Sequence, residues 1–232
     1  GNTEERTVLY ASTSIYDDMA IASSSEIVKD VRADDDRFGI YTKSAVVEPK
    51  EGYTYEITVK NAKGTLKNIV VYDLNHLSSK EHKEDFEENW WYGSFDGVIT
   101  TALEKAGAKP VIYYNEKRDA RITKEAEDPS SVLTEENGWI EASSWKKELK
   151  EVKAVAVDLR KEGFAIKEMG AISFQIHMIS PEEDESREDA EHSNTAKGDR
   201  PASYAYNNTG FYSETEETKI KQTVIGNSVQ VT

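Results

Sequence analysis

The chain has 232 residues, of which 37% are hydrophobic, with 12 Tyr and 4 Trp, so it can bury a sizeable core and does not have the composition of a disordered chain. Lys and Arg total 29 against 44 Asp and Glu, and the formal charge of -15 disfavours nucleic acid and anionic lipid as partners. The sequence contains no cysteine, which excludes disulfides and thiolate chemistry, and it has no nucleotide-binding glycine motif and no apolar run long enough for membrane insertion.

Residues 1–24 are expected to form an N-terminal extension or one extra strand. The opening GNTEERT lacks the basic and apolar segments of an export signal, so we interpret the chain as an excised mature segment. Residues 25–232 are expected to form one domain.

Short runs rich in Val, Ile, Thr and Tyr follow one another along that domain and are separated by turn residues. The clearest unit is YTYEITVKNAKGTLKNIVVYDL, which predicts a β-hairpin. The other strand-like runs are EIVKDVRA, GIYTKSAVV, PVIYYN, EVKAVAVDL, AISFQIHMIS, SYAYNNTGFY and KQTVIGNSVQVT. This pattern predicts an all-β protein, an antiparallel β-sandwich.

Two segments interrupt the strand pattern. Residues 76–108 combine charged, helix-favouring stretches with an aromatic cluster, so they are expected to be an inserted loop with one or two short helices. Residues 180–201 are almost entirely polar and are expected to form a loop between paired strands. A further decorated loop is expected at DPSSVLTEENGWIEASSWKKELK.

Strand alternation places three polar residues on faces that otherwise carry apolar side chains: Lys29, Asp73 and Asn207. Burial should favour a neutral amine on the lysine and a neutral acid on the aspartate. Such an acid can polarise the carboxamide of an asparagine while the amine attacks its carbon and ammonia leaves. These residues therefore predict a spontaneous intramolecular isopeptide bond.

The same order of residues resembles a known family. A lysine on an early strand, then YEITVKN and VVYDL, and late in the chain AYNNTGF, are similar to the isopeptide-forming Ig-like domains of Gram-positive surface proteins, including antigen I/II-type adhesins and pilin-like stalks. The resemblance covers about residues 25–213. It implies an Ig-like β-sandwich at the bacterial cell surface or cell wall, with neighbouring domains of the same protein as partners and no cofactor. It also implies that Lys29 and Asn207 become joined and that Asp73 promotes the reaction.

The asparagine has a neighbour of the same type, Asn208, on the opposite face of the strand. We favour Asn207 because its face also carries Ala205 and Phe211, whereas Asn208 shares its face with tyrosines. The simpler interpretation of each residue is structural: a lysine that reaches water, an aspartate that caps a turn, and an asparagine that is hydrogen-bonded in a sheet.

NWWYGSF suggests a second function. Trp90, Trp91 and Tyr92 are candidates for a platform that stacks on sugars, which would make the chain a carbohydrate-binding module with a glycan or host ligand. Core packing is the competing explanation for these aromatic residues. Trp139 and Trp145 are expected to lie in loops and are weaker candidates for sugar stacking.

Other chemistry has weaker support. With 44 acidic residues the sequence singles out no catalytic carboxylate pair for a glycosidase, and it contains no GxSxG motif, so we expect no enzyme. The turn ADDDRFG lacks the ligand spacing of an EF-hand, and we expect no metal site. We expect ordinary surface or packing roles for the histidines: His76, His82, His177 and His192.

Overall fold

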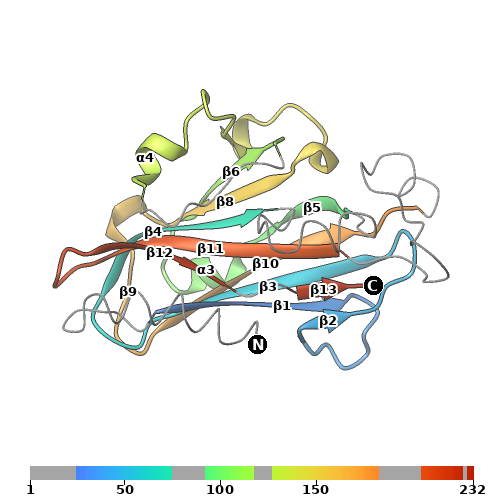
Figure 1. Cartoon of the computed structure of the whole chain (residues 1–232), viewed down its shortest axis with the longest axis horizontal. Coiled ribbons are helices and arrows are strands. Elements are labelled where there is room, and N and C mark those ends of the chain that lie inside the picture. Colours follow the sequence, from blue (N-terminus) through green and yellow to red (C-terminus); the bar gives the residue numbers. More distant parts are fainter. Residues whose placement is uncertain (1–24, 75–91, 118–126, 183–204, 227–228) are drawn as a thin grey trace, which may run out of the picture.

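The computed structural model describes residues 25–74, 92–117, 127–182, 205–226 and 229–232. These residues form two β-sheets that pack face to face, with loops and short helices over the outer face of one sheet (Figure 1). The predicted all-β sandwich is therefore confirmed. The expected extension 1–24 and most of the polar loop 180–201 lie outside the described residues.

The first sheet has four antiparallel strands. Their spatial order is β1 (Glu26–Ala33), β3 (Gly52–Lys60), β10 (Ala171–Ile179) and β5 (Ser94–Ile99). Buried and more exposed positions alternate along β1 and β10, as expected for strands with one face on the core.

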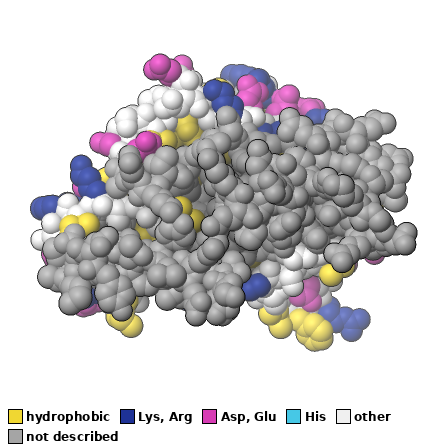
Figure 2. Space-filling view, viewed as in Figure 1, with side chains coloured by type: hydrophobic (Ala, Val, Ile, Leu, Met, Phe, Trp, Pro, Cys, Tyr) yellow, Lys and Arg dark blue, Asp and Glu magenta, His cyan; other side chains and the backbone are white. Residues whose placement is uncertain are grey.

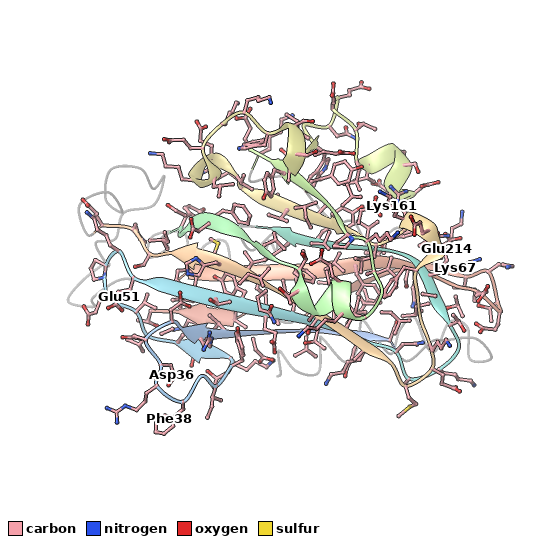
Figure 3. The ribbon with its side chains drawn as sticks, turned by 180° about the vertical axis from the view of Figure 1, so that it is seen from behind. Asp36, Phe38, Glu51, Lys67, Lys161 and Glu214 are labelled. Carbon is pink, nitrogen blue, oxygen red and sulfur yellow. The ribbon has the colours of Figure 1, made fainter. Side chains whose placement is uncertain are left out.

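The second sheet is larger and contains one parallel pair, between β2 and β13. Its order is β2 (Ser44–Ala45), β13 (Val229–Val231), β11 (Ala205–Thr215), β4 (Leu66–Leu74), β8 (Ala154–Asp158), β6 (Val111–Asn115) and β7 (Ile140–Glu141). Two further strands pair beside this path, β12 (Lys221–Ile225) with β11 and β9 (Ala165–Ile166) with β4. At the end of β4 and β11 farthest from Asp73, Lys67 and Glu214 are register partners (Figure 3).

β4 is buried on both faces because the second sheet has a core on each side. Ile69 and Val71 belong to the main core between the sheets. Val70 and Tyr72 belong to a smaller cluster with Trp139, which the loop after β6 brings against the outer face. The middle of the strand, residues 69–72, is therefore a continuous run of apolar and aromatic residues in the sequence.

The helices in the described residues are short and lie in connections. They are α3 (Thr101–Lys105), α4 (Pro129–Val132), and the 3-10 turns η2 (Ala142–Ser144), η3 (Leu149–Glu151) and η4 (Lys161–Gly163). Asp128 starts α4 by accepting a hydrogen bond from the backbone N–H of Ser130. The prediction of helical decorations in loops is confirmed.

The structure differs from the sequence-based expectation in two segments. Residues 76–108 were expected to be an inserted loop, but they contain β5, and Phe95 of β5 and Leu103 of α3 are buried in the main core. GIYTKSAVV was expected to be a strand, but it contains only the two-residue strand β2 and an isolated bridge between Thr42 and Val31. In this loop the Asp36 carboxylate accepts backbone N–H groups from Phe38 and Ile40, and the Phe38 side chain points away from the sheets (Figure 3).

Gly93, just before β5, packs against a buried tyrosine and leads to a stability prediction. A Cβ at position 93 would lie 1.8 Å from Oη of Tyr53, whose side chain is fully buried. Gly93→Ala should therefore destabilise the protein by about 1–3 kcal/mol, measured by urea unfolding. The same substitution should cost less when Tyr53→Phe is also present, and an equal cost in both backgrounds would contradict this explanation.

Candidate functional site

Lys29 is directed into the protein by the alternation of β1. It follows Ile27 and precedes Val31 on the inward face, and both of these residues belong to the main core. The Lys29 side chain is completely buried. A fully buried lysine is rare unless its charge is paired or lost.

The partner of Lys29 is Asp73, near the end of β4. The two side chains are buried, and Lys29 Nζ lies 2.6 Å from Asp73 Oδ1. Lys29 belongs to the four-stranded sheet and Asp73 to the larger sheet, so the contact crosses the core between them. The structure thus brings together two of the three residues that the sequence singled out.

An aromatic ring borders the lysine and is backed by a second ring. Lys29 Nζ lies 4.1 Å from the centroid of the Tyr55 ring, and Tyr53 packs edge-on against Tyr55 with the ring centroids 5.4 Å apart. Both tyrosines are on β3, the neighbour of β1. The Tyr53 and Tyr55 side chains are as completely buried as the amine.

Burial sets the protonation behaviour of the lysine. It lowers the pKa of Lys29 to about 8, and the charge and hydrogen bond of Asp73 oppose this shift only in part. Such a group loses its proton at a lower pH than an ordinary lysine does. The arrangement can therefore present a nucleophilic amine beside a carboxylate that can accept its proton.

Asn207 lies on β11, the neighbour of β4. Thr209 is the register partner of Asp73, and its hydroxyl donates to the backbone carbonyl of Tyr72 at 2.9 Å. Asn207 precedes Thr209 by two residues and pairs with Val229 of β13, whereas Asn208 pairs with Leu74. The side chains of residues 205–208 lie outside the described residues.

The aromatic candidates for a sugar platform are only partly described. Trp90 and Trp91 lie outside the described residues, and Tyr92 is partly buried. Trp139 is buried against Tyr72, and Trp145 packs edge-on against Tyr114. These two tryptophans have packing roles.

In the described ranges, no group of three or more His, Asp or Glu side chains is arranged to hold a metal ion. No helix in the same part of the chain is long and apolar enough to cross a membrane. On the face in Figure 2, acidic and basic side chains lie next to one another along the upper edge, and apolar side chains gather at the lower edge, over the loop that carries β2.

One histidine has a more specific environment than the sequence indicated. His177, on β10, is held between the carboxylates of Asp34 and Asp96. Asp34 is 143 positions and Asp96 is 81 positions from His177 in the sequence, so no local motif indicates the contact.

Comparisons with solved structures return pilin and surface-protein domains of Gram-positive bacteria. The full-length major pilin SpaD from Corynebacterium diphtheriae is 12% identical with a TM-score of 0.36, over 89% of this chain and 34% of that one. The C-terminal domain of the Streptococcus agalactiae AgI/II polypeptide BspA is 11% identical with a TM-score of 0.38, over 89% of this chain and 49% of that one. The C-terminal domain of the Streptococcus pyogenes antigen I/II-family protein AspA is 11% identical with a TM-score of 0.37, over 89% of this chain and 46% of that one.

This chain therefore spans about a third of the SpaD pilin and about half of each of the two streptococcal chains. No family model matches the sequence, and no curated protein matches it.

Proposed function

We propose that the chain is a structural stalk or adhesin module of a Gram-positive cell-surface protein, stabilised by an autocatalytic isopeptide bond between Lys29 and Asn207. Asp73 promotes the reaction, and the neighbouring domains of the same surface protein are its partners. The module turns over no substrate and needs no cofactor. The observation that carries this proposal is the buried contact between Lys29 and Asp73 in the core between the two sheets.

The register of β11 supports Asn207 as the electrophile. Positions 207, 209 and 211 have the same parity along the strand, and Thr209 pairs with Asp73 while Phe211 lies in the main core. Val229, the register partner of Asn207, also lies in the main core. Position 208 has the parity of Tyr212, which belongs to the smaller outer cluster.

The reaction is a transamidation with a simple balance. The neutral amine of Lys29 attacks Cγ of Asn207, the new N–C bond forms, and the bond from Cγ to Nδ2 breaks. Asp73 accepts a proton from the attacking amine and returns one to the departing nitrogen, which leaves as ammonia. Folding supplies the proximity, so no further co-reactant is required.

The bond would join the two sheets covalently. β1 belongs to the four-stranded sheet and β11 to the larger one, so a pulling force could pass through a covalent link instead of separating the sheets. The bond would give a domain without disulfides a covalent cross-link that helps it to resist shear and proteolysis outside the cell.

Intact-mass measurement tests the proposal. The denatured chain should be lighter than its sequence by one ammonia, and digestion should yield a branched peptide that contains Lys29 and Asn207. Lys29→Ala should restore the full mass. A full mass for the unmodified chain would leave Lys29 and Asp73 as a buried ion pair and remove the proposed chemistry.

The carbohydrate-binding alternative rests on Trp90, Trp91 and Tyr92 and remains a prediction from the sequence. Titration with a panel of glycans separates the two functions, because a pure stalk should show no change in tryptophan fluorescence.

A further inference from the structure

A row of hydrogen-bonded side chains crosses the outer face of the four-stranded sheet. His177 Nδ1 lies 2.7 Å from Asp96 Oδ2 on β5, and His177 Nε2 lies 2.5 Å from Asp34 Oδ2 in the turn after β1. The other oxygen of Asp34 accepts a hydrogen bond of 2.7 Å from the hydroxyl of Thr54 on β3. Each of the four strands therefore contributes one side chain to this row, either from the strand itself or, for β1, from the turn that directly follows it.

The backbone is arranged to allow this row. His177 and Thr54 are register partners on β10 and β3. The pairing of β10 with β5 shifts between His177 and Met178, so that Asp96 is the extra residue of a bulge, and Gly97 beside it has a φ of 126°. Position 52 has no space for a side chain, because a Cβ there would lie 2.3 Å from Asp34 Oδ2 and 2.8 Å from His177 Nε2.

The two carboxylates make the row dependent on the charge of the imidazole. A protonated ring donates a hydrogen bond from each nitrogen, one to each carboxylate. A neutral ring has only one N–H, so one carboxylate must then face a nitrogen lone pair. The row is complete only while His177 is protonated.

Other charged groups on this face have partners of their own. Glu56, two residues after Thr54 on β3, accepts a hydrogen bond from Gln175 of β10 at 3.0 Å. Arg32, the register partner of Thr54 on β1, lies over the Tyr41 ring at 5.2 Å. The two aspartates are therefore the charges in direct contact with the imidazole.

We propose that Asp34, His177 and Asp96 form a pH-sensitive clasp that holds the four strands of this sheet together in acid and weakens when the imidazole loses its proton at higher pH. The clasp lies on the outer face of the sheet, away from the Lys29–Asp73 pair, and does not depend on the proposed isopeptide bond.

The direction of the pH dependence follows from linkage. Partial burial by itself would lower the pKa of His177, but the hydrogen bonds and charges of Asp96 and Asp34 outweigh it and raise the pKa above its usual value of 6.5. A raised pKa in the folded state means that the stabilisation is fully present below the unfolded value and is lost as the pH rises through the folded value.

Thermal unfolding of the full chain at pH 5.5 and pH 8.5 tests the clasp, with His177→Gln as the variant. The high net negative charge also makes acid favourable, so the informative quantity is the difference between the two proteins. The substitution should lower the Tm by about 2–4 °C more at pH 5.5 than at pH 8.5. An equal loss at both pH values would overturn the proposal.

One further measurement completes the test. In Asp96→Asn, which keeps the histidine but removes one carboxylate, NMR titration should show a lower pKa for the His177 ring than in the unmodified protein. A His177 ring that titrates at or below the usual value in the unmodified protein would overturn the clasp even if the variants fold poorly.

Discussion

Asn207→Ala should lower the free energy of unfolding by about 5 kcal/mol, whereas Asn208→Ala should have a much smaller effect. The reason is the length of chain that the proposed bond closes: the loop-entropy relation for cross-links gives about 5 kcal/mol for a closure of roughly 180 residues. The alanine at 207 removes the electrophile and with it the whole closure. The alanine at 208 removes only the contacts of one side chain.

Denaturant unfolding and intact mass, measured on the same samples, check this expectation. Asn207→Ala should have the full mass, a lower unfolding midpoint and faster cleavage by protease, while Asn208→Ala should keep the ammonia deficit. If the deficit instead disappears in Asn208→Ala and persists in Asn207→Ala, the assignment from strand parity is wrong and Asn208 is the electrophile.

The inward positions of Lys29 and Asp73 could be predicted from sequence because each lies within a regular stretch of its strand. Ile27 and Val31 fix the inward face of β1, and Ile69 and Val71 fix that of β4, so a period of two was sufficient. That the two side chains meet was not predictable from either strand. It depends on how the two sheets stack, and this is a tertiary property.

The clasp could not be predicted for a related reason. His177 and Thr54 belong to regular strands, but Asp96 reaches the histidine through a bulge and Asp34 through a turn. The bulge and the turn both interrupt the alternation of side chains between the two faces of a strand, on which the sequence interpretation relied. The strand expected at GIYTKSAVV is shortened by a similar local feature: Asp36 accepts the backbone N–H groups of Phe38 and Ile40, and pairing with β1 begins only at Thr42.

Asp73→Ala should be the most damaging single change to the core once the cross-link has been removed. In an Asn207→Ala background it leaves Lys29 fully buried without the carboxylate that lies 2.6 Å from its amine. Breaking one side of a buried ion pair typically costs 3–5 kcal/mol, about the range expected here. The loss in the free energy of unfolding should shrink at alkaline pH, because the buried amine is then uncharged.

A matched variant separates the charge effect from a general loss of packing. In the same background, Lys29→Met combined with Asp73→Leu removes both charges and fills the space with apolar side chains, so most of the stability should return. Urea unfolding of the three proteins gives the comparison. If Asp73→Ala does not fold, the double replacement still decides the matter: its recovery to the level of Asn207→Ala would show that the unpaired charge was the cause. A double replacement as unstable as Asp73→Ala would mean that this part of the core depends on the shape of the original pair rather than on its charges.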